Sequence, residues 1–152
     1  MNTTDSSTRE IVITRMINAP RTRVWETWTT ADHLAKWWGP DGFTTTTHEF
    51  NFSVGGRWRF IMHGPDGTDY PNHIVFTQIK VPELIAHDHG GDDGKVHFRA
   101  VVTFEEKDNG TLVTLRSVFP SAQDRDRVVK DHDAIEGGKQ TLGRLAEYAE
   151  TK

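Results

Sequence analysis

The chain has 152 residues, of which 35% are hydrophobic and 10% aromatic, with a formal net charge of −4 and no cysteine. This length fits one domain, the aromatic content argues against intrinsic disorder, and the weakly acidic balance gives no electrostatic support for binding nucleic acids or anionic membranes. The absence of cysteine excludes disulfides, thiolate catalysis and cysteine-based zinc sites.

Residues 1–8 are polar and are interpreted as a loose tail ahead of a single domain over residues 9–152. The tail lacks the apolar segment of a signal peptide, and no apolar run approaches the roughly 18 residues that suggest a membrane span. We therefore expect a cytoplasmic protein with no nucleic-acid or membrane partner.

The first segments predict a strand followed by two short helices. Glu10–Ile17 is apolar and β-branched, which favours a strand. Pro20 suits the first turn of a helix, where its missing N–H needs no partner, and apolar residues follow it at helical spacing. A second short helix over Asp32–Trp37 is expected to end at Gly39-Pro40.

Between Phe43 and Phe119 apolar and polar residues alternate with the period of two that is typical of β-strands. Turn signals such as Gly64-Pro65-Asp66-Gly67 separate the segments. This pattern predicts strands over residues 44–52, 57–62, 68–80, 84–89, 95–104 and 111–119, with an irregularity at Pro71.

The later strands are predicted to have two faces of opposite character. If a short loop after His89 joins two strands, Ala86 lies opposite Phe98 and His87 lies opposite His97. The histidines then share a face with lysine and arginine side chains, which we interpret as solvated. Three histidines on paired strands can build a metal site, but neighbouring cations and the lack of enclosure argue against one. We predict no metal and no cofactor.

Residues from Ser121 to about Glu150 predict a long amphipathic helix. Its apolar positions step by three or four along one face, and Gly137-Gly138 is the expected place of a kink. The apolar face of the sheet is the surface large enough to receive this helix. The predicted fold is α+β: a curved antiparallel sheet of about seven strands around a long C-terminal helix, with room for a cavity between the two layers.

Three segments carry a resemblance to a known family: ITRMINAPRTRVWETWTTADHLAKWWGPDGF from residue 13, GGRWRFIMHGPDGTDY from residue 55 and AIEGGKQTLGRLAEY from residue 134. With the element order, they resemble the START-like (SRPBCC) superfamily and its helix-grip fold, within it the family related to the C-terminal domain of the activator of heat shock protein 90 ATPase. The resemblance implies a hydrophobic cavity that takes apolar ligands, and it connects the chain with stress response. That co-chaperone has a separate N-terminal domain where this sequence has a polar tail, which argues against stimulation of a chaperone.

The resemblance makes inward-facing aromatic and apolar residues candidates for the cavity wall. Trp37 and Trp38 lie roughly 100° apart around a helix axis, so one can anchor the helix while the other reaches the cavity rim. Gly138 leaves space for either a ligand or close helix–sheet packing. Ordinary core packing is the alternative for every candidate, since each buried side chain contributes about 1.5–3 kcal/mol. The candidate ligand-binding residues are Trp28, Trp37, Trp38, Phe50, Trp58, Phe60, Met62, His73, Phe76, Phe98, Phe119, His132, Gly138 and Leu142.

His73 and His132 are also the candidates for a general base, with a structurally satisfied histidine as the alternative. The sequence contains no nucleophile elbow and no phosphate-binding loop. We therefore expect a module that binds a small apolar or amphipathic molecule without catalysis. A cyclase- or hydrolase-like enzyme and a chaperone-interacting module are the alternatives. An exposed Trp37 or Trp38 would favour a homodimer.

Overall fold

The computed structural model describes residues 7–91, 95–132 and 134–150. Within these ranges one seven-stranded antiparallel sheet has the strand order β1-β7-β6-β5-β4-β3-β2. The strands are β1 (Glu10–Ile17), β2 (Thr44–Phe50), β3 (Arg57–His63), β4 (Asp69–Lys80), β5 (Leu84–Gly90), β6 (Val96–Lys107) and β7 (Gly110–Val118), and a short 3₁₀ turn, η1 (Ser7–Arg9), precedes them.

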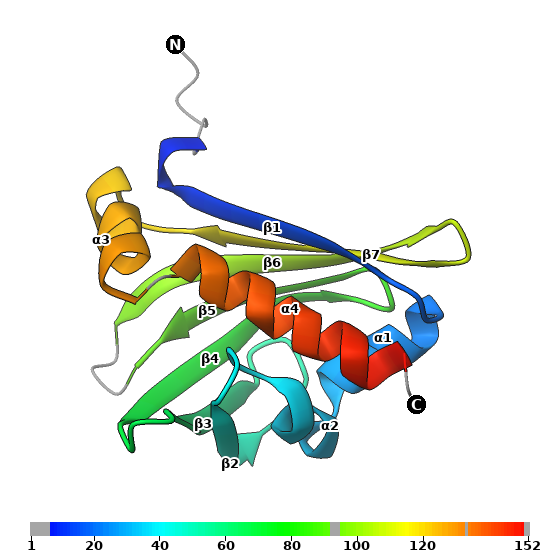
Figure 1. The fold of residues 1–152 in the computed structure, drawn as a ribbon, viewed down its shortest axis with the longest axis horizontal. Helices are drawn as coiled ribbons and strands as arrows, with labels where there is room; N and C mark the ends of the chain where they lie inside the picture. The colour runs from blue at the N-terminus through cyan, green and yellow to red at the C-terminus, as the bar shows by residue number, and fades with distance from the viewer. Residues whose placement is uncertain (1–6, 92–94, 133, 151–152) are drawn as a thin grey trace.

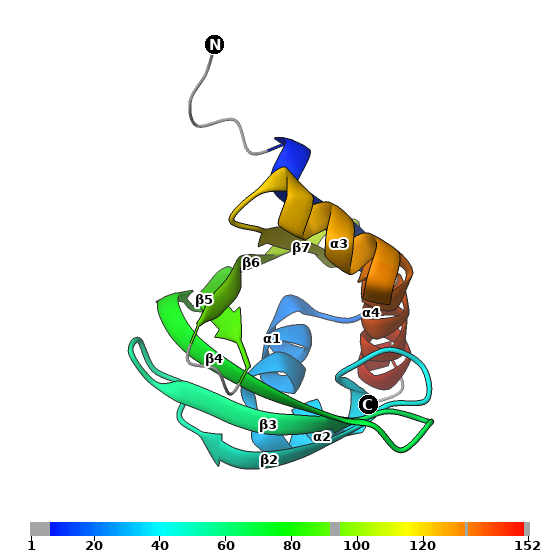
Figure 2. The same cartoon turned by 90° about the vertical axis from the view of Figure 1, so that its left-hand side faces the viewer.

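The sheet curves around helix α4 (Ala134–Glu150), as Figures 1 and 2 show. Leu142 and Leu145 of α4 have no exposed surface, and Ala149 is equally buried. The predicted α+β helix-grip fold is confirmed. The C-terminal helical region, however, consists of two helices in different directions, because α3 (Ala122–His132) crosses one end of the sheet before α4 begins (Figure 2).

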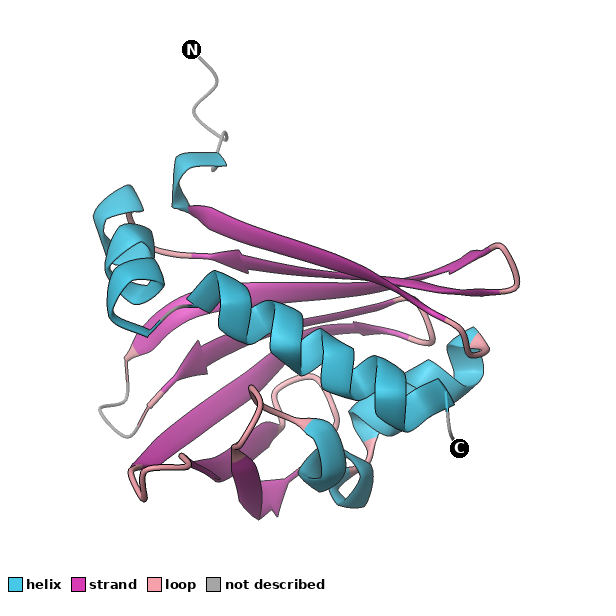
Figure 3. Ribbon diagram, in the orientation of Figure 1, coloured by secondary structure: helices cyan, strands magenta, loops and turns pink. Residues whose placement is uncertain are grey.

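Two short helices, α1 (Arg21–Thr29) and α2 (Ala31–Trp37), lie at the end of the sheet opposite α3 (Figure 3). Helix α2 ends where predicted, because Gly39 adopts a φ of +105°, a left-handed conformation that only glycine takes readily. A Cβ at this position would also lie 3.0 Å from the Cε of Met62. The loop that follows is therefore pressed against β3.

Aromatic rings fill the core beneath α1 and α2. The ring centroid of Trp38 lies 4.9 Å from that of Trp58, which stacks on Phe60 at 3.9 Å. Trp37 is fully buried, and its Nε1 donates to the backbone oxygen of Thr27 over 3.0 Å. Trp37 thus belongs to the core, and the half-buried Trp38 packs against it. Neither ring is exposed in the way that would favour a homodimer, and the homodimer stays a prediction.

Strand β5 presents the face opposite to the predicted one. His89 lies opposite Phe98, whereas Gly90 lies opposite Val96. A β-bulge between His89 and Gly90 shifts the register by one residue, and such a shift exchanges the two faces of a strand. His87 is only 3% exposed. The prediction of a solvated histidine face is therefore wrong for β5, whose histidines point inward.

The β6–β7 hairpin keeps its predicted faces although its register differs. Asp108 and Asn109 have positive φ values of 50° and 67°, as a tight two-residue turn requires. Phe104 consequently pairs with Val113 rather than with Thr111. The difference of two residues leaves every side chain on its predicted side, so the apolar inner face of this hairpin is confirmed.

Candidate ligand-binding cavity

A cavity of about 1100 Å³ lies between the inner face of the sheet, α3 and the start of α4. Figure 2 views the molecule from the end that α3 crosses. The volume is slightly above the roughly 300–1,000 Å³ usual for small-molecule sites. The lining residues are Ile11, Ile13, Pro40, Phe43, Met62, Tyr70, Pro71, Asn72, His89, Lys95, Val96, His97, Phe98, Leu115, Ser117, Phe119, Pro120, Asp124, Arg127, Val128, Lys130, Asp131, Ala134 and Gly138.

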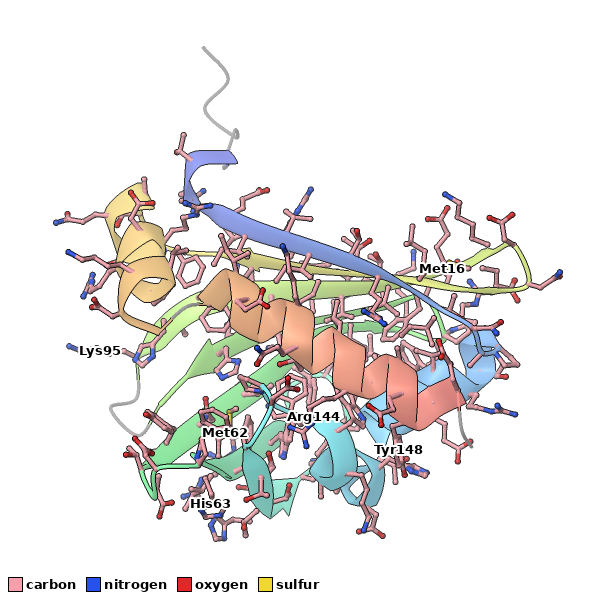
Figure 4. All side chains as sticks on the ribbon, in the orientation of Figure 1. Met16, Met62, His63, Lys95, Arg144 and Tyr148 are labelled. Atoms are coloured by element: carbon pink, nitrogen blue, oxygen red, sulfur yellow. The ribbon has the colours of Figure 1, made fainter. Side chains whose placement is uncertain are left out.

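The loop between α2 and β2 forms one wall of the cavity, and α4 holds it in place. Pro40 and Phe43 line the cavity, and the Phe43 ring lies 5.9 Å from that of Tyr70. Nη1 of Arg144 donates to the backbone oxygens of Gly39 and Pro40 at 2.9 Å each and of Phe43 at 3.2 Å. Figure 4 labels Arg144 between α4 and this loop. One guanidinium thus positions the whole wall segment.

Helix α4 lies close to β1 at Gly138. A Cβ there would overlap the Cδ1 of Ile13, so glycine lets the helix lie this close without displacing the end of that side chain. Both residues line the cavity. Of the two interpretations made for Gly138, close helix–sheet packing is present, and the glycine also forms part of the wall.

A polar pair interrupts the apolar wall where β4 meets β5. Nε2 of His89 lies 2.8 Å from Oδ1 of Asn72. Nδ2 of Asn72 donates to the backbone oxygen of Tyr70 over 2.8 Å. Because the amide nitrogen is committed to that carbonyl, Oδ1 of Asn72 is the acceptor, and His89 carries its proton on Nε2. The His89 ring also stacks on Phe98, with the centroids 4.6 Å apart.

Burial keeps the two inner histidines of β5 uncharged. Desolvation lowers the pKa of His87 to about 4, against a smaller opposing effect of Asp88. Desolvation also lowers the pKa of His89 well below its usual value, and the nearby His87 and His97 add to this effect. Both imidazoles are therefore neutral at physiological pH.

The predicted ligand-binding residues divide between the cavity and the core. Those in the cavity wall are Met62, Phe98, Phe119 and Gly138. The others with described side chains on the inner surfaces pack instead in the core: Trp28, Trp37, Trp38, Phe50, Trp58, Phe60, Phe76 and Leu142. The physical reason is that aromatic rings fill the end of the sheet at which α1 and α2 lie, whereas residues of α3 line the cavity. Figure 1 shows α3 at the opposite end of the sheet from α1 and α2.

Of the two histidines proposed as general bases, His73 does not line the cavity. His73 pairs with Arg59 in the sheet, on the face opposite to the buried rings of Trp58 and Phe60. Its position on the outer face follows from the regular register around Pro71, because the irregularity of β4 lies between Phe76 and Gln78 instead. The side chain of His132 lies outside the described residues.

Several wall residues were missed from the sequence. Ile11 and Ile13 on β1 and Val128 on α3 line the cavity. Their periodic spacing marked them as inward-facing, and this signal could have found them. Asn72 and His89 carried no comparable signal, because only the β-bulge turns His89 inward.

Neither a metal site nor a membrane helix is apparent in the part of the chain that the structure describes. In residues 7–91, 95–132 and 134–150, no three histidine, aspartate or glutamate side chains are grouped so as to hold a metal ion. The described helices are each too short or too polar to cross a membrane.

Comparison with known proteins finds a family model that matches most of the chain and solved bacterial structures with a similar fold. The model of the family "Activator of Hsp90 ATPase homolog 1-like protein" matches residues 18–150. Protein Ms6760 from Mycobacterium smegmatis is 29% identical, with a TM-score of 0.83 over 94% of this chain and 91% of that one. A protein from Arthrobacter aurescens is 26% identical, with a TM-score of 0.86 over 97% and 90% of the two chains. Protein NE0264 from Nitrosomonas europaea, 19% identical over 97% of each chain with a TM-score of 0.86, shares the fold. No curated protein matches the chain.

Proposed function

The chain belongs to the family of Activator of Hsp90 ATPase homolog 1-like proteins, and from its cavity we propose that it binds a small apolar or amphipathic molecule without converting it. The observation that carries the proposal is the cavity of about 1100 Å³ between the sheet, α3 and α4. Burial of an apolar ligand in such a space contributes roughly 25 cal/mol for each Å² removed from water.

The composition of the wall supports an amphipathic ligand. Apolar side chains such as Leu115 and Phe119 cover the sheet side, whereas α3 contributes the charged residues Lys130 and Asp131. Lys95 points away from the molecule at this end (Figure 4). A ligand with an apolar body and a polar end would match this division.

Filling the cavity tests the proposal. Ser117 lines the cavity from β7 between Ile11 and Ala100, so Ser117→Phe places a ring in the ligand space. We expect the affinity for 1-anilinonaphthalene-8-sulfonate, measured by fluorescence, to fall at least about tenfold, the equivalent of roughly 1.4 kcal/mol. Thr114→Phe is the matched control, because Thr114 lies on the other face of the same strand.

Two results would contradict the proposal. One is a folded Ser117→Phe variant that binds the probe as well as the wild type. The other is wild-type protein that binds no probe. If neither result is found, native mass spectrometry of protein purified from its own host identifies the natural ligand by its mass.

Catalysis by a cavity histidine is the second candidate function. His89 lines the cavity, has a hydrogen-bond partner in Asn72, and has a lowered pKa, which are properties of many catalytic bases. Hydrolysis of 4-nitrophenyl butyrate that is lost in His89→Leu would favour an enzyme. A rate equal to that of the buffer would argue against a hydrolase.

The family's description names activation of the Hsp90 ATPase. A chaperone-interacting role in the cytoplasm is therefore a further proposal for this chain. Isothermal titration calorimetry with the purified chaperone of the host tests it, and the absence of measurable association would exclude it.

A further inference from the structure

We propose that the ligand of this cavity presents a neutral hydrogen-bond donor, such as a hydroxyl group, to Nδ1 of His89. This inference rests on the proposed binding function. It adds the polar contact by which the protein would select among apolar molecules of similar size.

The hydrogen bonds around His89 determine which of its ring nitrogens is the acceptor. The side-chain amide of Asn72 donates to the Tyr70 carbonyl and accepts from His89 Nε2. A neutral imidazole carries a single proton, and this proton is on Nε2. Nδ1 of His89 therefore presents a lone pair.

That lone pair is available to a ligand. In the described part of the chain Nδ1 of His89 has no hydrogen-bond partner. It also differs from Nε2 of His73 and Nδ1 of His87, which are unpartnered atoms sealed from solvent. Because His89 forms part of the cavity wall and its Nδ1 is not among the sealed atoms, the proposal places this acceptor toward the cavity.

The ring that carries the acceptor is held from several sides. Phe98 stacks on it, the ring of Phe60 meets it at 72° with centroids 6.2 Å apart, and His87 lies 5.8 Å away. An immobilised acceptor costs little conformational entropy when a ligand binds. The direction of the contact is therefore set before the ligand enters.

The charge state of His89 favours a donor over an acid. A carboxylate would place its own lone pairs against Nδ1, and relief by protonating the imidazole is disfavoured by the lowered pKa of His89. The cationic side chains of the cavity wall, Lys95, Arg127 and Lys130, are the groups that would attract an acid instead. Comparing the affinities of ligands that carry a hydroxyl or a carboxylate therefore tests this preference.

The test compares three naphthalenes of similar size by fluorescence titration at pH 7.5: 2-naphthol, 2-methoxynaphthalene and 2-naphthoate. We expect wild-type protein to bind 2-naphthol roughly 2- to 10-fold more tightly than the methoxy compound, the value of one hydrogen bond. His89→Leu should abolish this preference and still bind the methoxy compound. His48→Leu, the same substitution at an exposed histidine of β2, should retain the preference.

Each outcome separates the two proposals. Equal affinities of wild-type protein for 2-naphthol and 2-methoxynaphthalene, or a preference for 2-naphthoate, would overturn the inference and leave the binding function standing. No binding of any of the three would overturn both.

A second measurement needs no variant and so does not depend on the folding of His89→Leu. Nitrogen-15 NMR of the histidine rings should show the His89 proton on Nε2, and 2-naphthol should shift the Nδ1 resonance. A proton on Nδ1 in the free protein would refute the proposed acceptor.

Discussion

Replacing Arg144 with methionine removes the cation that ties α4 to the cavity loop. Nη1 of Arg144 lies within 3.2 Å of the backbone oxygens of Gly39, Pro40 and Phe43. Methionine keeps an unbranched apolar stem but donates no hydrogen bond. Three backbone oxygens therefore lose their shared donor, and the loop loses its attachment to the helix.

The size of the effect follows from the geometry. Nη1 has two protons, so at most two of the three contacts are full hydrogen bonds at any moment. A hydrogen bond from a charged group contributes about 1.5–3 kcal/mol. Because Arg144 is half-buried and the freed oxygens can be hydrated in part, we expect the free energy of unfolding to fall by roughly 2–4 kcal/mol.

Urea denaturation followed by tryptophan fluorescence measures this change. Lys139→Met is the matched control, because Lys139 is exposed on the same helix. The Arg144→Met variant should also bind 1-anilinonaphthalene-8-sulfonate more weakly, since Phe43 is part of the cavity wall. A loss of stability no larger than the roughly 0.5 kcal/mol of a surface substitution would refute the role assigned to Arg144.

Two further predictions concern pH and packing, both measured by urea denaturation. The pKa of His87 is about 4 in the folded state and near 6.5 in the unfolded state. Between these pH values the unfolded chain therefore binds more protons than the folded one. Stability is lost as the pH falls from about 6.5 to about 4. His87 should make the free energy of unfolding about 2 kcal/mol lower at pH 5 than at pH 7.5. His87→Phe should remove this contribution to the pH dependence. An unchanged pH dependence in the variant would contradict the lowered pKa of His87. Gly138→Ala should lower the free energy of unfolding by about 1–2 kcal/mol, because the new Cβ overlaps the Cδ1 of Ile13. The same change should be neutral or stabilising in an Ile13→Val background, because valine lacks the Cδ1 atom. Simple additivity of these two substitutions would show that no clash exists.

The order and type of the elements were predictable because their signals are local. Pro20 precedes α1, Gly39 ends α2, and alternation of apolar residues marks the strands. The β6–β7 hairpin shows how robust such signals are, since its inner face was correct even though its register was two residues off. A register shift of an even number of residues leaves every side chain on the same face of the strand, because side chains alternate with a period of two.

The candidate site was less predictable, because its signals are not local. The apolar stripe of a strand or helix faces inward whether it meets packed rings or open space. Trp58 and Met62 lie on the same strand, yet Trp58 packs in the core and Met62 lines the cavity. The positions of α2 and α3 at opposite ends of the sheet make this difference.

From residue order alone one could obtain the α+β class, the helix grip and the set of inward-facing positions, since each depends on periodicity within a segment. The three-dimensional arrangement was needed to locate the cavity, to separate α3 from α4, and to bring Asn72 beside His89. The reason is physical: a single bulge before Gly90 reverses the faces of β5, and contacts between distant segments decide where side chains fill the interior and where they leave it open.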